Sequence, residues 1–372
     1  MKIALIHDWL VTKSGAEKVL KEIYKLCPDS DIFTIVNFLS QKDKKNIFID
    51  EKNDSKKYSK NPKIITSFVQ KLPFAKKYFR YYFPLFPKAI ESFDLSSYDL
   101  IISSSWGFAK GVKKHKNQIH ICYCHTPIRY AWDLHDEYTK DLFFIKKILA
   151  KPSLKYIRAW DIASLDRVDF FIANSKFVAN RIKKIYSKNA KVIYPPLDID
   201  KFNICKEKSD FYLSVSRLVA YKKTRLIIEA FNEMPNKTLL VIGQGEQYEI
   251  LKKIAKENIH ILGFVDEKAL SYYMQKAKAF VYAGIEDFGI VFSEALASGT
   301  PIVAFDGGGA KKIVDGKKNG LLFRKQDKES IKQAIKKFEN MIFNPSMLRQ
   351  NALKYTHFQN DFSKFLNSKM KK

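Results

Sequence analysis

The sequence predicts an α/β protein made of two Rossmann-like, doubly wound domains. In both halves of the chain, short apolar runs alternate with amphipathic stretches, which is typical of parallel sheets covered by helices. A length of 372 residues suits two domains better than one. The consecutive prolines Pro195 and Pro196 separate two such blocks and indicate a linker. We therefore expect domains at residues 1–196 and 197–350 and a C-terminal helix within residues 351–372.

The first half begins with an apolar strand at residues 2–7, followed by a turn at Gly15 and a helix with apolar residues at helical spacing. Asn174 and Ser175 are suited to cap a later helix. The lysine-rich stretch at residues 41–63 has no clear period, so we expect a surface loop or short irregular strands. Further strands of this half are expected at residues 99–105, 120–125 and 170–173.

The second half repeats the alternation. Helices are expected from Thr224, from Glu246, at residues 267–278 and from Gly289, and the last of these ends at Gly299, because glycine readily closes a helix. The strands are expected at residues 211–216, 238–242, 260–265, 279–283 and 301–305.

The chain is strongly basic. It has 66 lysines and arginines against 39 acidic residues, a net charge of +27. Such a charge favours an anionic partner, namely nucleic acid, an acidic membrane surface or a phosphorylated substrate, although a lysine-rich source composition explains it equally well. No run of about 18 uncharged apolar residues is present, so we expect a cytoplasmic protein. The four cysteines have no zinc spacing and no disulfide framework, and Cys122 and Cys124, on an expected strand, are expected to pack in the core.

Two acidic residues flank the start of the helix at Gly289. Glu286 precedes the helix and Glu294 lies inside it, with seven residues between them. Open parallel sheets bind ligands at the carboxyl ends of their strands, and a helix start offers unpaired N–H groups to a phosphate. We therefore expect both carboxylates to bind hydroxyl groups of one ligand. The alternative is an ordinary exposed helix with two solvated glutamates.

The surrounding residues argue against that alternative. Glu286, seven residues and Glu294, followed by Ala-Leu-Ala-Ser-Gly-Thr-Pro, resemble the signature of the retaining glycosyltransferases of family four. The resemblance implies the GT-B arrangement, in which two Rossmann-like domains face each other across a cleft and the C-terminal helix returns to the first domain. It also implies a nucleotide-activated sugar as the donor.

A second motif, Tyr-Cys-His-Thr-Pro-Ile-Arg-Tyr-Ala-Trp-Asp at residues 123–133, resembles a subgroup of that family with mannosyltransferases of bacterial polysaccharide assembly. By this resemblance, His125 lies beside the donor sugar and Arg129 near the acceptor. Without it, a histidine at a strand end is more often structural.

The resemblance assigns the remaining roles. Arg217 and Lys223 follow an expected strand and neutralise the donor diphosphate, with Lys222 as a neighbouring candidate. The expected catalytic residues are His125, Glu286, Arg217 and Lys223. The expected donor-binding residues are Gly15, Arg217, Lys223, Val265, Glu286, Phe288, Gly289, Ile290, Val291 and Glu294.

No metal and no cofactor other than the donor is expected. The Asp-x-Asp sequence at Asp198 and Asp200 falls in the linker and not at a strand end, so we interpret it as incidental. Fixed cations and the helix start can stabilise the charge of the leaving phosphate instead.

Two stretches of the first domain predict contact with an anionic membrane. Residues 68–93 interleave aromatic residues with Lys76, Lys77 and Arg80, and residues 146–158 are basic and apolar. An aromatic and cationic helix can lie in the headgroup region of a bilayer. The same helix could instead pack on the sheet with its lysines in water. Base stacking is a third use of aromatic residues, but no nucleic-acid-binding motif accompanies them.

The resemblance therefore implies a retaining hexosyltransferase. We expect it to transfer a hexose, namely mannose from GDP-mannose, to a lipid-linked or saccharide acceptor at the inner face of the membrane. One alternative is a basic module that binds membrane or nucleic acid without catalysis. Another is a sugar-nucleotide epimerase of the same two-domain fold.

Overall fold

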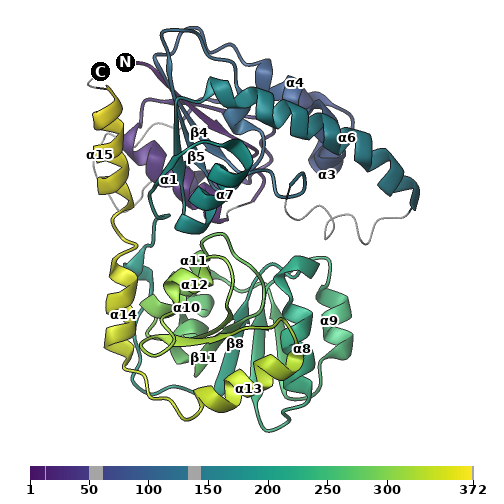
Figure 1. Cartoon of the computed structure of the whole chain (residues 1–372), viewed down its shortest axis with the longest axis vertical. Coiled ribbons are helices and arrows are strands. Elements are labelled where there is room, and N and C mark those ends of the chain that lie inside the picture. The colour runs from purple at the N-terminus through teal and green to yellow at the C-terminus, as the bar shows by residue number, and fades with distance from the viewer. Residues whose placement is uncertain (13, 50–61, 133–143, 371–372) are drawn as a thin grey trace. The chain divides into compact units, whose positions relative to one another are not determined.

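The computed structural model describes residues 1–12, 14–49, 62–132 and 144–370, and only the backbone of residues 144–151. The chain forms two compact units, residues 1–196 with 358–372 and residues 197–357. Each unit contains one parallel sheet with helices against its faces (Figure 1). The predicted fold class, two doubly wound α/β domains, is confirmed.

The first sheet has seven parallel strands in the order β3-β2-β1-β4-β5-β6-β7. Alternate residues of a strand reach two separate cores, since Ala4 and Ile6 pack in one cluster and Leu5 in the other. Burial on both faces explains why residues 3–6 of the first strand are continuously apolar. The strands are β1 (Ile3–His7), β2 (Asp31–Thr34), β3 (Ile64–Thr66), β4 (Leu100–Ser105), β5 (Ile119–Cys124), β6 (Phe170–Ala173) and β7 (Ala190–Val192). The longer helices are α1 (Gly15–Leu26), α2 (Gln41–Phe48), α6 (Phe144–Ala163) and α7 (Lys176–Tyr186).

The second sheet has six parallel strands in the order β10-β9-β8-β11-β12-β13. They are β8 (Phe211–Val215), β9 (Thr238–Ile242), β10 (Ile259–Gly263), β11 (Ala279–Tyr282), β12 (Ile302–Phe305) and β13 (Gly320–Phe323). The helices are α8 (Thr224–Asn232), α9 (Tyr248–Ile254), α10 (Glu267–Lys276), α11 (Ile290–Ala297), α12 (Ala310–Ile313), α13 (Lys328–Phe338) and α14 (Pro345–Leu353).

The last helix, α15 (Phe358–Met370), belongs to the first unit. Phe362 is fully buried in a core of that unit, and the rings of Phe358 and Tyr123 are 5.8 Å apart. The expected boundary at residue 350 falls inside α14, which packs on α11 of the second unit, so that boundary is wrong. The chain passes to the first unit only at Phe358.

Part of the lysine-rich stretch at residues 41–63 is helical and not irregular. Ser40 caps α2 by accepting a hydrogen bond from the backbone N–H of Asp43, and Ile47 and Phe48 are buried. These two apolar residues hold the helix on the core. The lysines that precede them hide any helical period of apolar residues in the sequence. Residues 50–61 lie outside the described part of the chain.

The predicted single helix within residues 68–93 is also wrong. The stretch is divided among η2 (Phe68–Lys71), α3 (Ala75–Tyr78), η3 (Phe79–Leu85) and α4 (Phe86–Glu91). Pro73 and Pro84 cannot donate the helical hydrogen bond, and Phe74 is left-handed with φ 51°. The aromatic side chains of residues 68–93 are therefore divided between the core and the surface, and Phe79 and Phe86 are among those in the core.

No helix in the described part of the chain is long and apolar enough to cross a membrane.

Candidate functional site

Glu286 lies at the carboxyl edge of the second sheet, in the loop that follows β11. Its Oε1 accepts hydrogen bonds from the Lys222 ammonium group and from the Tyr282 hydroxyl. The side chains of Lys222 and Glu286 are 14% and 17% exposed, so the pair is partly shielded but accessible to a ligand. The lysine and the tyrosine therefore fix the carboxylate where a sugar hydroxyl could meet it.

Lys222, and not the predicted Lys223, is the lysine that the fold brings to Glu286. Lys223 has φ 58°, a left-handed conformation, and begins the turn into α8. A close backbone approach supports this arrangement, because a Cβ atom on Gly284 would lie 2.9 Å from the carbonyl oxygen of Lys222. The two adjacent lysines could not be distinguished by residue type alone.

Arg217 stands two residues after the end of β8, at the same edge of the sheet. Its side chain is 56% exposed, and its Nη2 lies 3.9 Å from Glu246 Oε1. The Leu218 N–H donates to the Gln244 carbonyl at 2.9 Å, and a Cβ on Gly243 would overlap the Ser216 carbonyl oxygen. The glycine therefore allows the loop after β9 to support the loop that carries Arg217.

Helix α11 starts beside Glu286. Its N-cap, Gly289, has φ 83°, and a Cβ there would lie 2.3 Å from the Phe292 ring and 3.3 Å from Glu286 Cβ. Ile290 and Val291 are the first two helical residues, whose N–H groups have no acceptor within the helix. This is the electropositive end of the helix, as the sequence predicts.

The remaining donor-binding candidates occupy the same unit. Phe288 is 4% exposed and packs on Tyr355, with ring centroids 5.2 Å apart. Glu294 is 7% exposed on α11. Val265 follows β10, which ends at Gly263, so Val265 lies in a loop and not in the predicted strand.

A glycine run after β12, to which the sequence analysis gives no role, supports the Glu286 loop. The N–H of Gly309 donates to the Glu286 carbonyl oxygen at 2.7 Å. A Cβ on Gly308 would lie 2.2 Å from the same oxygen, so glycine is required for this close contact. The three consecutive glycines after the strand are the sequence feature that could have predicted this close backbone contact.

In the first unit, His125 directly follows β5, as predicted. Its N–H donates to the Ser105 carbonyl at 2.8 Å, and its own carbonyl accepts from Asn174 Nδ2 at 2.9 Å. Its Nε2 is 2.9 Å from the hydroxyl oxygen of Ser104. The ring is therefore oriented by groups from neighbouring strand ends.

Gly15 is the first residue of α1, and it is not among the glycines with positive φ. A left-handed turn is thus not the reason for glycine at this position. The nearby Asp8, which the sequence analysis does not identify, accepts hydrogen bonds from the backbone N–H groups of Trp106, Phe108 and Ala109. Burial raises the pKa of Asp8 although these N–H groups favour its ionised form.

Arg129 lies half-buried in the turn after His125. Neighbouring residues of this turn are fixed from two helices: Arg181 of α7 donates to the Thr126 hydroxyl at 2.9 Å, and Trp132 Nε1 donates to Asp161 of α6 at 2.8 Å. The last residue of the quoted motif, Asp133, lies outside the described residues.

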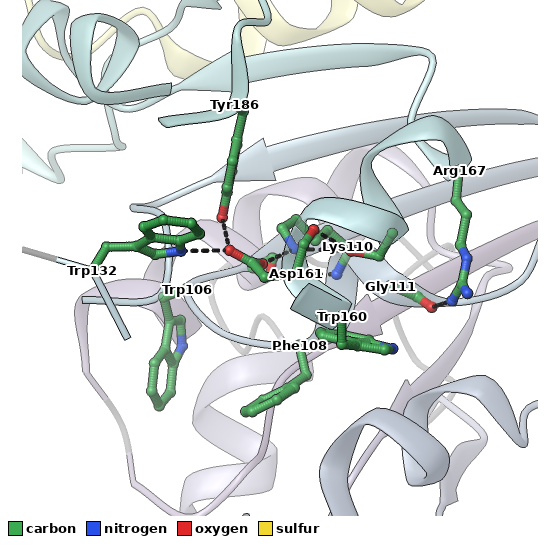
Figure 2. Close-up of polar contacts among 12 residues, drawn as sticks. Trp106, Phe108, Lys110, Gly111, Trp132, Trp160, Asp161, Arg167 and Tyr186 are labelled. Carbon is green, nitrogen blue, oxygen red and sulfur yellow. Dashed lines mark hydrogen bonds and ion pairs between the residues drawn. The ribbon is translucent and has the colours of Figure 1, made fainter. Parts of the chain in front are cut away.

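A buried ion pair holds this turn in place (Figure 2). The ammonium group of Lys110 contacts Asp161 Oδ1 and the Ser164 hydroxyl, and the Tyr186 hydroxyl donates to Asp161 Oδ2 at 2.9 Å. Lys110 and Asp161 are 1% and 0% exposed. Since Trp132 donates to the same carboxylate oxygen as Tyr186, the pair connects the short 3-10 helix at Ala109–Gly111, α6, α7 and the turn after His125.

Exposed aromatic residues and cations share one surface of the first unit. Phe74 and Tyr81 are 80% and 71% exposed, and Lys76, Lys77 and Arg80 are exposed between them. These five residues are called the aromatic–cationic surface below. The other predicted basic stretch, residues 146–158, lies on α6, where only the side chains from residue 152 onward are described.

Two family models match the chain. The model described as glycosyl transferases group 1 matches residues 198–355, and the model described as glycosyltransferase family 4 matches residues 33–201.

Individual relatives are more distant. The chain is 29% identical to an uncharacterized glycosyltransferase of Methanocaldococcus jannaschii, over 61% of this chain and 60% of the relative. It is 26% identical to an uncharacterized glycosyltransferase of Haemophilus influenzae, over 54% and 57%. It is 29% identical to the phosphatidyl-myo-inositol mannosyltransferase of Mycobacterium leprae, over 29% of each chain. The matches thus span less than two thirds of these curated relatives.

Among solved structures, the Anabaena protein Alr3699/HepE in complex with UDP and glucose aligns with a TM-score of 0.68. The alignment covers 98% of this chain and 99% of that chain at 17% identity. This likeness shows the fold.

Replacing Lys110 with alanine should strongly destabilise the first unit, because it leaves the Asp161 carboxylate buried without its cation. The expected loss is about 3–5 kcal/mol. Urea unfolding of the full chain followed by tryptophan fluorescence measures it, since all four tryptophans lie in residues 1–196.

The control is Lys188→Ala, which removes an exposed lysine 3.5 Å from Asp166 and should cost about 0–1 kcal/mol. Equal losses in the two variants would show that the buried pair does not hold the unit together.

Proposed function

Because the chain belongs to the group 1 glycosyltransferases of the GT-B fold, we propose that it transfers a sugar from a nucleotide-diphosphate donor to an acceptor hydroxyl. The observation that carries the proposal is the cluster at the carboxyl edge of the second sheet. There, Glu286 is held by Lys222 and Tyr282 next to the start of α11. The UDP and glucose named for the Anabaena protein support a donor of this class.

The leaving diphosphate is the group with the most charge to stabilise. Arg217 supplies a planar pair of donors, Lys222 a point charge, and the N–H groups around Gly289, Ile290 and Val291 the positive end of a helix. We assign the lysine role to Lys222 in place of the predicted Lys223, because Lys222 contacts Glu286.

The acidic residues bind hydroxyl groups. Glu286 faces the donor sugar and Glu294 the ribose, while the departing phosphate oxygen takes the proton of the acceptor in a retaining transfer. Glu286 is already bound to a lysine and a tyrosine, so it serves as a ligand for the sugar and not as a nucleophile. We assign His125 and Gly15 to the donor sugar and Arg129 to the acceptor, as the family resemblance implies.

The sugar that we propose is mannose, carried by GDP, for cell-surface polysaccharide assembly. Two likenesses support this choice, the motif at residues 123–133 and the mannosyltransferase named for Mycobacterium leprae. Thermal shifts with UDP, GDP and ADP, then with the matching sugar nucleotides, identify the donor, because saturating ligand raises stability by about 2.7 kcal/mol at a hundredfold Kd.

The acceptor that we propose is lipid-linked and met at an anionic membrane surface. The aromatic–cationic surface supports this, since Phe74 and Tyr81 can enter the headgroup region while Lys76, Lys77 and Arg80 contact acidic lipids. We propose that the working protein is peripheral and lies on the inner face of the membrane.

The first prediction concerns the donor. Lys222→Ala and Arg217→Ala should each weaken the binding of the preferred nucleoside diphosphate about tenfold to a hundredfold, because each removes a charge-assisted contact worth about 1.5–3 kcal/mol. Isothermal titration calorimetry measures the change. The matched control is Lys223→Gly, which removes the same charge one residue away at a left-handed position that glycine adopts readily. A larger loss in Lys223→Gly than in Lys222→Ala would return the role to Lys223.

The second prediction is that transfer does not need a divalent metal, because fixed cations and the helix start neutralise the diphosphate. Release of the nucleoside diphosphate from the matching sugar nucleotide should proceed at the same rate with EDTA. Loss of activity in EDTA that manganese restores would contradict this.

The third prediction concerns the membrane. The protein should sediment with anionic but not with zwitterionic vesicles, and salt should release it. Changing Lys76, Lys77 and Arg80 to glutamate should abolish sedimentation and leave donor binding intact.

The matched control changes three exposed lysines of α7, Lys176, Lys183 and Lys184, to glutamate and alters the net charge by the same amount. If both triple variants lose sedimentation with anionic vesicles equally, vesicle binding depends on total charge and not on the aromatic–cationic surface.

A further inference from the structure

A connected row of polar side chains runs from the start of α1 to His125 within the first unit. Glu17 Oε1 lies 3.6 Å from His7 Nε2, His7 Nδ1 lies 3.2 Å from Ser104 Oγ, and Ser104 Oγ lies 2.9 Å from His125 Nε2. The four residues come from α1, β1, β4 and the end of β5. The row therefore joins elements that are distant in sequence.

The inner part of the row is closed to solvent. Glu17 is 3% exposed, His7 0% and Ser104 1%, whereas His125 is partly exposed. Burial opposes ionisation of Glu17, but His7 and Ser14 hold its pKa below the ordinary value. The Glu17 carboxylate thus lies at the buried end, and a partly exposed imidazole lies at the other end.

The carboxylate determines where the protons lie. His7 Nε2 has no hydrogen-bond partner among the described residues, so the carboxylate 3.6 Å away is the acceptor that it faces, and this favours an N–H at that nitrogen. In neutral His7, Nδ1 is then an acceptor and takes the single proton of the Ser104 hydroxyl. Ser104 in turn accepts from His125 Nε2–H, which leaves Nδ1 of His125 unprotonated.

A neighbouring pair shows that this arrangement is not simply how histidines pack in this sheet. Ser103 and His120 also lie on β4 and β5, with Oγ and Nε2 2.8 Å apart, but His120 Nδ1 lies 2.8 Å from the Arg167 carbonyl. Burial lowers the pKa of His120 to about 4, so it stays neutral. That histidine contacts a neutral carbonyl group, whereas His7 faces a carboxylate.

We propose that Glu17, His7 and Ser104 are positioning residues that fix the orientation and tautomer of His125 and provide a path for one proton. When His125 Nδ1 takes up a proton, the Nε2 proton passes to Ser104 as the Ser104 proton passes to His7 Nδ1. One proton enters at His125 Nδ1, and one proton is transferred across each of the two hydrogen bonds to Ser104. The positive charge then lies on His7 beside Glu17. The catalytic importance of this relay rests on the proposed function of His125, but its existence does not.

The test is the tautomer of His125, measured by imidazole nitrogen NMR on protein labelled at its seven histidines. A spectrum of His125→Asn assigns the signal. The parent should hold neutral His125 as the Nε2–H tautomer, and Ser104→Ala should lower the population of that tautomer. A parent with His125 predominantly Nδ1–H would overturn the proposal without any variant.

Glu17→Gln tests the relay at its far end. The carboxylate Oε2 accepts from the Ser14 backbone N–H and hydroxyl, so the amide oxygen must stay there and the amide NH₂ must face His7. His7 Nε2 then becomes an acceptor, each proton in the row shifts, and His125 should switch to the Nδ1–H tautomer. If the tautomer of His125 is unchanged in both Glu17→Gln and Ser104→Ala, the proposed relay is wrong.

Two controls change similar groups outside the row. Glu22→Gln alters a partly buried glutamate of the same helix α1, and Ser103→Ala removes the partner of His120. Neither should change the His125 signal. Where transfer is measurable, Glu17→Gln should lower kcat with donor affinity retained. If the parent and the variants show the predicted tautomers but the parent binds no sugar nucleotide, that result counts against the proposed function and not against the relay.

Discussion

The parallel direction of every strand in each sheet is the constraint on which the rest of the structure depends. Because the carboxyl ends of parallel strands meet at one edge, the loops after them gather there whatever their distance in sequence. In the second unit this brings Lys222, after β8, to Glu286, after β11, and brings Gly309, after β12, to the same loop. In the first unit it brings Ser104 of β4 to His125 after β5. Each cluster of polar groups is thus a consequence of sheet topology.

Close backbone contacts give these loops their rigidity. The loop of Arg217 rests on Gly243, the turn of Lys222 on Gly284, and the loop of Glu286 on Gly308, and at each glycine a Cβ atom would come within 3 Å of a carbonyl oxygen. Such contacts replace flexible side-chain packing with backbone packing, which restricts where the charged groups can lie. A polar group held in one place before the ligand arrives loses less entropy on binding.

The first unit buries charge in two different ways. Lys110 and Asp161 form a direct ion pair. Further hydrogen bonds to the two charged groups come from Ser164, Tyr186 and Trp132, so the pair holds together the elements that carry these residues. Glu17 instead faces His7, whose Nδ1 lies 3.2 Å from Ser104 Oγ. The first arrangement is a direct ion pair, and the second connects α1 to β4 through a histidine of β1.

The sequence by itself determined the fold class, the strands other than β2, β3, β7 and β13, the helix that starts at Gly289 and the place of Glu286, Arg217 and His125 at strand ends, because alternation of apolar residues and glycine positions are local signals. Only the tertiary structure decided which of two adjacent lysines meets Glu286, since that depends on the left-handed turn at Lys223. It also decided that the aromatic residues around Pro84 divide between core and surface, because the prolines break the helix that their spacing suggests. The same holds for His7, Ser104 and Glu17, which are far apart in sequence and become neighbours only when β1, β4 and α1 pack together.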